Sequence, residues 1–267
     1  MHPTLPRLSI ITPVLNGAAT LPRCLDAVAA WGPAVIEHWI IDGGSTDGTQ
    51  ALVQQRIDAQ PAGGPLRLLS EPDRGIADAW NKGLRRVSGD WVGIVNADDW
   101  YEPEALAPLL PVLQSLPAGQ EVIVHGRTRL HDPISGAARE SGPLVWIPEK
   151  HFRPLEKMPA QHPTCFVPRA TYQRIGGFNE SFRIAMDYEF LLRAHLAGVQ
   201  FHYLPQVITN FSKGGVSDRQ VARSQREVLA AKILHRNQVL GPVWEHFQLL
   251  RRNAMRRWRR RLLGRKI

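Results

Sequence analysis

The first half of the chain alternates between short apolar runs and segments whose apolar residues recur at helical spacing, and this alternation constrains the fold most strongly. Short apolar runs are typical of buried strands, while apolar residues three and four positions apart indicate helices that bury one face. We predict strands over Leu8–Val14, Val35–Ile41, Leu66–Leu69, Trp91–Val95 and Glu121–His125. We predict helices over Ala18–Ala30, Thr46–Ile57, Ile76–Val87 and Glu104–Leu116, with Ser45 or Thr46 as the N-cap of the second. Such repeated units predict a Rossmann-like α/β fold, in which a mostly parallel sheet is flanked by helices.

The second half is less regular. Residues 126–160 are rich in glycine, proline and charge, so we expect extended segments and loops that cover the sheet. Beyond them, apolar patterns predict strands over Thr164–Val167 and Gln200–Val207 and helices over Met186–Leu196 and Gln220–Arg236.

Each of the first four predicted strands ends in polar residues. These residues are Asn16, Asp42, Asp73 and the group Asn96, Asp98 and Asp99. Because ligands of parallel α/β sheets bind at the carboxyl ends of the strands, we expect these side chains to share one rim. Two carboxylates beside an amide suit a divalent cation and the phosphates that accompany it. The alternative for Asp99 is that it caps the following helix or is simply solvated.

Three further residues have two interpretations each. Lys82 lies on a predicted helix face four residues after Asp78, so it either contacts a phosphate or forms a surface ion pair with Asp78. Asp187 opens a predicted helix, where it is either a general base or an acid that the helix dipole favours. His162 is the histidine that we place nearest the site, although a histidine packed in the core or a loop is the more common case.

Composition narrows the function classes. Cys24 and Cys165 are the only cysteines, so no disulfide framework or CxxC metal pattern exists and a reducing compartment is favoured. No apolar stretch is long enough to span a bilayer, and the N-terminal residues do not resemble a signal peptide. We therefore expect a cytoplasmic protein. The GxGxxG, P-loop and GxSxG patterns do not occur, which weighs against a dinucleotide oxidoreductase, an ATPase and a serine hydrolase.

The positive charge is concentrated in one segment. The net charge is +9, and residues 251–267 hold eight Arg and one Lys with no acid. Residues 1–250 therefore carry 24 basic and 24 acidic residues. With tryptophan and leucine interleaved, residues 251–267 could lie on an anionic membrane surface. Nucleic-acid binding and a solvated tail are the alternatives; we favour the membrane and expect no nucleic-acid partner.

Several motifs occur in the order typical of one enzyme family. They are Ser9-Ile-Ile-Thr-Pro-Val-Leu-Asn16, Ile41-Asp-Gly-Gly-Ser-Thr-Asp-Gly-Thr49, Ser70-Glu-Pro-Asp-Arg-Gly-Ile-Ala-Asp-Ala-Trp-Asn-Lys-Gly83, Asn96-Ala-Asp-Asp99, Gln161-His-Pro-Thr164, Ile175-Gly-Gly-Phe-Asn-Glu180, Ala185-Met-Asp-Tyr-Glu-Phe-Leu-Leu-Arg193 and Gly214-Gly-Val-Ser217. Over roughly residues 8–218 the chain resembles family 2 glycosyltransferases, most nearly the bacterial exopolysaccharide or colanic-acid type.

The resemblance implies a GT-A fold and inverting transfer of a sugar from a nucleotide diphosphate-sugar to a glycan or lipid-linked acceptor, with Mg²⁺ or Mn²⁺. It assigns donor binding to Pro13, Val14, Asn16, Asp42, Asp73, Lys82, Asn96 and Asp98. It also makes Asp98 the metal ligand, with Asp99 beside it, and Asp187 the base that deprotonates the acceptor hydroxyl.

The same resemblance divides the chain into a GT-A domain over 1–218 and a C-terminal helical region over 219–267 that ends in the Arg-rich tail. The domain would comprise a nucleotide-sugar half at about 8–125 and an acceptor half at about 126–218. Lipid-linked acceptors would place the enzyme peripherally on the inner face of the cytoplasmic membrane.

Two departures from the family pattern stand out. Asn96 replaces the first acid of the family's DxD motif, and Met186 replaces the first acid of its frequent Glu-Asp pair. The degenerate DxD motif leaves a nucleotide-sugar-binding pseudoenzyme or regulatory binding protein as the alternative function.

Overall fold

The computed structural model describes residues 5–116, 119–132, 134–141, 160–215 and 220–236. Within these ranges the strands form one sheet in the order β3-β2-β1-β4-β8-β6-β9-β5, with β7 paired to β6. No helix in this part of the chain is long and apolar enough to cross a membrane. The Arg-rich segment 251–267 lies outside the described residues.

The first half of the sheet is parallel, as predicted. It consists of β1 (Leu8–Val14), β2 (Val35–Asp42), β3 (Leu66–Ser70) and β4 (Trp91–Ile94). All seven residues of β1 are buried, which agrees with the near-continuous apolar sequence of a strand covered on both faces.

The second half of the sheet changes direction. β8 (Phe166–Pro168) is antiparallel to β4 and to β6 (Val122–His131), β6 is parallel to β9 (Gln200–Ser212), and β5 (Trp100–Tyr101) is antiparallel to β9. β7 (Ala138–Glu140) makes a hairpin with the end of β6. Residues 126–131, expected to cover the sheet, are therefore part of it.

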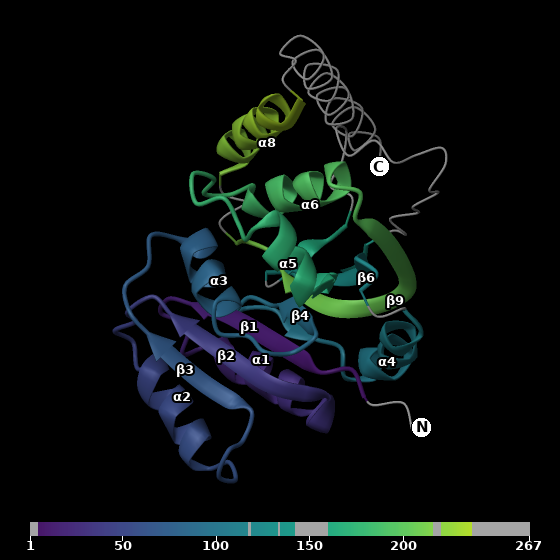
Figure 1. The fold of residues 1–267 in the computed structure, drawn as a ribbon. Helices are drawn as coiled ribbons and strands as arrows, with labels where there is room; N and C mark the ends of the chain where they lie inside the picture. Colours follow the sequence, from purple (N-terminus) through teal and green to yellow (C-terminus); the bar gives the residue numbers. More distant parts are fainter. Residues whose placement is uncertain (1–4, 117–118, 133, 142–159, 216–219, 237–267) are drawn as a thin grey trace, which may run out of the picture.

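Helices pack on both faces of the sheet (Figure 1). α1 (Leu21–Ala29), α2 (Thr49–Asp58) and α4 (Leu106–Ser115) bury apolar residues with Ile10 and Ile40 on one face. α3 (Ile76–Leu84), α5 (Arg169–Ile175) and α6 (Met186–Leu196) pack over Ile11 and Ile41 on the other. Consecutive residues of a strand thus pack into the hydrophobic cores on opposite faces of the sheet, because side chains alternate across a strand.

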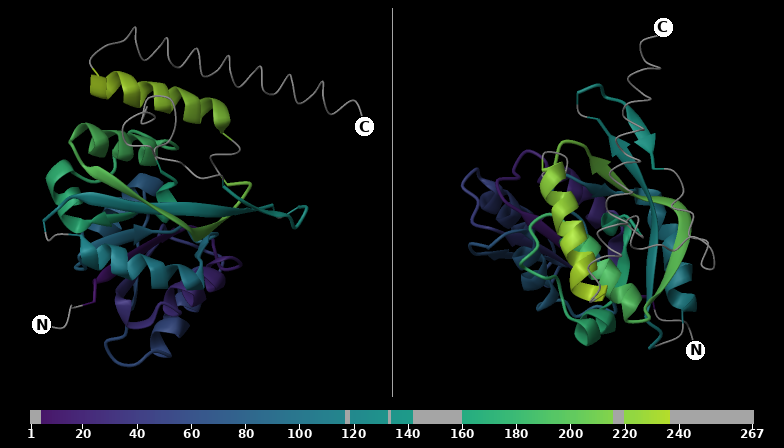
Figure 2. Two further views of the ribbon diagram at one scale, coloured as in Figure 1. Left: turned by 90° about the vertical axis from the view of Figure 1, so that its right-hand side faces the viewer. Right: turned by 90° about the horizontal axis from the view of Figure 1, so that it is seen from above.

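A further helix, α8 (Val221–Arg236), lies on the outer side of α6 (Figure 1, Figure 2). It joins the core of that face through Ala231, which is fully buried, and through Val228. The helix was predicted over nearly the same residues.

Some predicted helix starts are wrong. α1 begins at Leu21 rather than Ala18, and α2 begins at Thr49 with Gly48 as its N-cap, so neither Ser45 nor Thr46 is the cap. Gly48 has φ 94°, a left-handed conformation that glycine adopts without strain. The residues that precede α1 form hydrogen bonds with the residues that precede α2, at the carboxyl ends of β1 and β2. α5, β5 and β7 were not predicted, because each is short and lacks a clear apolar period.

Candidate active site

The loops that follow β1 and β2 are tied together by hydrogen bonds. The Asn16 N–H donates to Ser45 Oγ at 2.7 Å, and the Ala18 N–H donates to the Asp47 carboxylate at 2.9 Å. In return the Thr46 N–H donates to Asn16 Oδ1 at 2.9 Å. Asn16 has φ 53°, the only non-glycine residue with positive φ among those described, and asparagine tolerates that conformation well. Two of the strand ends that were expected to share a rim are thus physically joined.

Pro13, Val14 and Asp42 form the floor beneath these loops. Pro13 and Val14 are buried at the end of β1, beside Ile41 and Asp42 of β2. The Asp42 carboxylate is fully buried and accepts hydrogen bonds from Ser70 Oγ at 2.7 Å and from the Gly44 and Ser45 N–H groups at 3.2 Å. Asp42 therefore organises the turn after β2, and its role toward a nucleotide base stays a prediction.

Asp73 lies directly above that turn. Its Oδ1 accepts from the Gly75 N–H at 2.8 Å, and its Oδ2 is so close to Gly43 that any side chain at Gly43 would collide with it. Glycine at position 43 is therefore required for Asp73 to reach the rim between the ends of β2 and β3.

Lys82 is buried rather than open to the rim. Its ammonium donates to the Pro72 carbonyl at 2.6 Å and forms ion pairs with Glu71 at 3.2 Å and Asp78 at 3.5 Å. The Asp78–Lys82 pair that was weighed as a surface contact is thus a buried one, since each side chain is less than a tenth exposed. Lys82 holds the loop after β3 against α3, and its predicted contact with a donor phosphate would require these bonds to rearrange.

Asn96, Asp98 and Asp99 follow β4, as predicted. Asp98 is exposed, whereas Asp99 is 1% exposed and accepts from the Ser212 N–H at 3.0 Å and from Asn96 Nδ2 at 3.2 Å. The expectation that Asp99 caps the next helix is therefore wrong, because its carboxylate faces the end of β9 instead. Ser212 Oγ also donates to the Asp98 carbonyl at 2.8 Å, which fixes the backbone of this turn.

The electrostatics of this turn favour a cation. Burial and the charge of Asp98 raise the pKa of Asp99 to about 8, and desolvation also raises the pKa of Asp98. Across the described part of the chain, no group of three or more His, Cys, Asp or Glu side chains could hold a metal ion. The residues present fit a cation that takes one or two oxygen ligands from the protein and the rest from water and phosphate, which is the usual coordination of Mg²⁺.

Asp187 reaches the same rim from the other half of the fold. Gly93 of β4 pairs with Phe166 of β8 in antiparallel register, so the residues before Phe166 run beside the residues after Gly93. Cys165 lies there, and the Asp187 charge acts on its thiol. Burial raises the pKa of Asp187 to about 6, although the Tyr188 N–H donates to its Oδ1 at 2.7 Å. A carboxylate with that pKa is mostly ionised at neutral pH and is a stronger base than an exposed aspartate.

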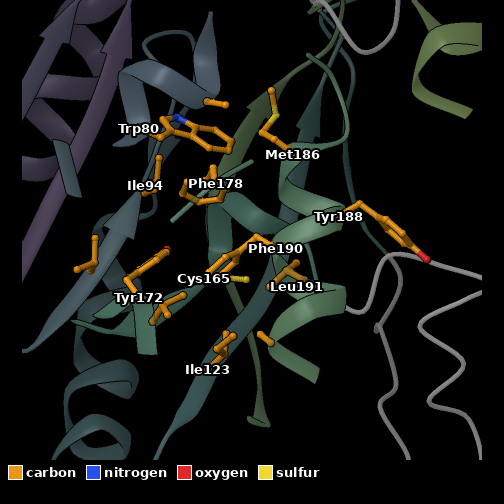
Figure 3. Packing of buried hydrophobic residues seen from close by; sticks show 14 of the residues in the cluster. Trp80, Ile94, Ile123, Cys165, Tyr172, Phe178, Met186, Tyr188, Phe190 and Leu191 are labelled. Atoms are coloured by element: carbon orange, nitrogen blue, oxygen red, sulfur yellow. The ribbon is translucent and has the colours of Figure 1, made fainter. Parts of the chain in front are cut away.

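His162 belongs to the wall of this region. Its ring stacks on Trp80 with centroids 4.8 Å apart, and Phe178 lies 4.6 Å from Trp80 and 5.0 Å from Phe190. Figure 3 shows Trp80, Phe178 and Phe190 as part of the apolar packing between α3 and α6. Burial lowers the pKa of His162 to about 3, so the ring is neutral and packs as a core histidine, the more common case of the two considered.

Sequence reasoning missed the contacts that bring α3 and the segment before α6 together. Asn81 donates to the Phe178 carbonyl at 2.9 Å and accepts from its N–H at 2.8 Å, and Arg74 pairs with Glu180 at 2.6 Å. A side chain at Gly177 would collide with Asn81. The Gly-Gly pair before Phe178 is the sequence feature that could have predicted this contact, since adjacent glycines mark turns and leave room for a neighbouring side chain.

The rim therefore presents two carboxylates with raised pKa, Asp98 after β4 and Asp187 at the start of α6. Beside them lie the glycine-containing loops that follow β2 and β3. Such an arrangement can bind a charged leaving group on one side and accept a proton on the other.

Comparisons with known proteins agree with this chemistry. The family model described as "Glycosyl transferase family 2" matches residues 9–175, which is more than half of the chain. A glycosyltransferase of PGL/p-HBAD biosynthesis from Mycobacterium tuberculosis is 29% identical over 216 residues, covering 80% of each chain.

Two solved structures share the fold. TarS of S. aureus in complex with UDP-GlcNAc superposes with a TM-score of 0.65 at 17% identity, covering 91% of this chain and 71% of its own. The mannosyltransferase PcManGT from Pyrobaculum calidifontis, in complex with GDP-Man and Mn²⁺, gives a TM-score of 0.65 at 21% identity, with 92% and 69% covered. The fold is therefore GT-A. Because the segment matched by the family model carries all four strand ends of the rim, we conclude that this chain is an enzyme of glycosyltransferase family 2.

Proposed function

We propose that this glycosyltransferase moves a sugar, with inversion, from a nucleotide diphosphate-sugar to a hydroxyl of a glycan or lipid-linked acceptor in the synthesis of a bacterial exopolysaccharide. The observation that supports the proposal is that the chain leaving β4 toward Asp98 runs beside the chain entering β8, where the Asp187 charge acts on the Cys165 thiol. The donor complexes of TarS and PcManGT support a nucleotide-sugar as the donor.

On the donor side, the loops after β1, β2 and β3 would bind the nucleotide, with Asn16, Asp42 and Asp73 as its polar contacts. Asp98 would hold Mg²⁺ or Mn²⁺, with Asp99 buried beside it, and Asn96 would contact the ribose or sugar of the donor. The bound cation supplies neutralisation of the charge that develops on the departing diphosphate.

On the acceptor side, Asp187 accepts the proton of the attacking hydroxyl. The acceptor oxygen forms a bond to the anomeric carbon while the bond from that carbon to the diphosphate oxygen breaks. Since attack and departure occur on opposite faces, the configuration inverts and the nucleoside diphosphate leaves.

The test is turnover of a panel of UDP-, GDP- and dTDP-sugars, followed as release of nucleoside diphosphate with Mg²⁺ or Mn²⁺ present. Asp98→Ala and Asp187→Asn should each lower turnover of an active donor by at least about a hundredfold. Asp58→Asn is the matched control, because Asp58 is an exposed acid at the end of α2 whose carboxylate accepts a hydrogen bond from the neighbouring Gln54.

If neither substitution lowers turnover, the assigned roles are wrong. A chain that binds a nucleotide-sugar but turns none over would instead be the pseudoenzyme that Asn96 suggests.

We also propose that residues 251–267 bring the enzyme to anionic lipid, since they carry nine of the 33 basic residues and no acid. Co-sedimentation with phosphatidylglycerol vesicles compares the full chain with a chain ending at residue 250. Equal binding of the two would refute this role of the tail.

A further inference from the structure

α8 makes an unusual contact with the segment that leads into the catalytic helix. One carboxylate oxygen of Glu227, Oε2, accepts hydrogen bonds from three consecutive N–H groups, those of Arg183 at 3.0 Å, Ile184 at 2.7 Å and Ala185 at 3.0 Å. Consecutive backbone N–H groups that converge on one point form an anion-binding concavity. Here the anion is a side chain from a helix 42 to 44 residues further along the chain.

The contact is specific to the charged form of Glu227. Its side chain is 14% exposed, and although burial disfavours the carboxylate, the N–H groups outweigh this effect and lower the pKa of Glu227. Arg223, one turn earlier on α8, adds an ion pair at 2.9 Å but is itself half exposed. Glu227 is therefore ionised, and its main partners are the three backbone groups.

Asp187 stands two residues beyond this contact. Ala185 is the N-cap of α6, and its carbonyl accepts the helix bond from the Glu189 N–H at 3.0 Å. In the described residues, the hydrogen bonds that the Asp187 carboxylate accepts come from two backbone N–H groups, that of Tyr188 at 2.7 Å and that of Asp187 itself. No side chain of another described element donates to this carboxylate, so its position is set by the backbone at the start of α6.

Two features fix that backbone. On the inner side, Met186 packs in the core beneath α6 (Figure 3). On the outer side, the segment 183–185 is anchored by Glu227. Further along α8, His235 Nε2 lies 2.7 Å from the buried carboxylate of Glu189 in the first turn of α6.

We propose that Glu227 is a positioning residue for Asp187: its carboxylate fixes the backbone of residues 183–185 and thereby holds the catalytic base at the rim. The inference rests on the proposed function of Asp187. It assigns a role in the reaction to α8, which lies outside the segment 9–175 that the family model matches.

The experiment compares Glu227→Ala, Glu227→Gln and Glu227→Asp in the full chain, with His235→Ala as the matched control. His235→Ala removes the contact between His235 of α8 and Glu189 of α6 and leaves residues 183–185 untouched. Each protein is assayed for kcat and donor KM with the active donor found in the panel, for Tm, and for hydrogen exchange of the amides of residues 183–185.

We expect Glu227→Ala to lower kcat by about a hundredfold, because a displacement of about 1 Å at a reacting group has an effect of that size. Donor KM should change by less than about twofold, since the donor side of the rim is not touched. The amides of 183–185 should exchange faster. Glu227→Gln keeps an acceptor oxygen and should recover most of kcat, while Glu227→Asp is one methylene too short and should not. His235→Ala should leave kcat unchanged whatever its effect on Tm.

The proposal is overturned if Glu227→Ala loses amide protection at 183–185 but keeps the wild-type kcat. It is also overturned if kcat, KM and Tm change together and equally in Glu227→Ala and His235→Ala, since that result indicates a role in stability alone. If Glu227→Ala does not fold, kcat of Glu227→Gln is compared with kcat of Glu227→Asp. A higher kcat for Glu227→Gln supports the proposal, and equal values overturn it. A wild-type chain that turns over no donor refutes the proposed function instead, and amide exchange then still tests the Glu227 contact.

Discussion

The raised pKa of Asp187 gives the most demanding test of the site. Burial raises that pKa from 3.8 to about 6. A base with this pKa is about 90% ionised at pH 7 and about 10% ionised at pH 5. We therefore expect kcat to fall about tenfold between pH 7 and pH 5, with a midpoint near 6, whereas an ordinary aspartate would give a midpoint near 4.

Asp187→Asn removes the base and keeps the shape of the side chain. Loss of a general base costs a factor of about 10² to 10⁴ in rate, and the residual rate should no longer show the acidic limb near pH 6. Full pH profiles of kcat for the wild type and the variant, measured with saturating donor and metal, test this directly. If the limb persists in Asp187→Asn, it belongs to another group and the assignment of the base is wrong.

Asp187→Asn should lower activity but raise the stability of the fold. The folded-state pKa of Asp187 lies above the unfolded value, so its charge opposes folding above about pH 6, and this penalty disappears as the pH falls from 6 toward 4. The difference between the two pKa values corresponds to an upper limit of about 3 kcal/mol. Asp187→Asn should thus raise Tm at pH 8 and have little effect at pH 4. A lower Tm of the variant at pH 8 would contradict the assumption that burial causes the shift.

Three further substitutions probe the scaffold of the rim. Gly43→Ala should weaken donor binding about tenfold in a calorimetric titration without a large change in Tm, because its side chain displaces Asp73; unchanged affinity would remove Asp73 from the donor site. Lys82→Met should destabilise the fold by about 1–3 kcal/mol in urea unfolding, because Asp78 loses its buried cation and keeps the Arg74 N–H bond and a 3.5 Å ion pair with the exposed Arg74 side chain; a change below about 0.5 kcal/mol would mean that the pair is open to water. Gly93→Ala should lower stability by about 1–3 kcal/mol, because the new carbon would lie 2.6 Å from the hydroxyl of Tyr101, and a variant of wild-type Tm would show that β5 can shift.

The parallel half of the fold was predictable because its signals are local. β1, β2 and β4 are predominantly apolar, and α6 was predicted at its observed bounds from its apolar pattern. β9 was predicted to end at Val207 but extends to Ser212, since its last residues are polar and pair with the end of β6. The short elements α5 and β5 carry too few residues for a periodic pattern to show.

The site was predictable as a set of strand ends but not as a set of contacts. That Asp98 and Asp99 follow a buried strand is visible in the sequence; that one is exposed and the other bonded to Ser212, 113 residues away, is not. Lys82 and Glu227 illustrate the same limit. Besides their ion pairs, Lys82 contacts the Pro72 carbonyl and Glu227 contacts three backbone N–H groups, and backbone groups leave no trace in composition or spacing.

The reversal of β8 has a consequence for how such enzymes can diversify. In the first half of the sheet, the rim is built by the loops that follow the strands, but β8 runs the other way, so the chain contributes to the rim before it enters that strand. A change of length in the loops after β1 or β2 alters the donor side, whereas a change of length ahead of β8 or α6 alters the side of Asp187. Under the proposed function, the two substrates would be served by separate parts of the chain, so that one specificity could change while the other is kept.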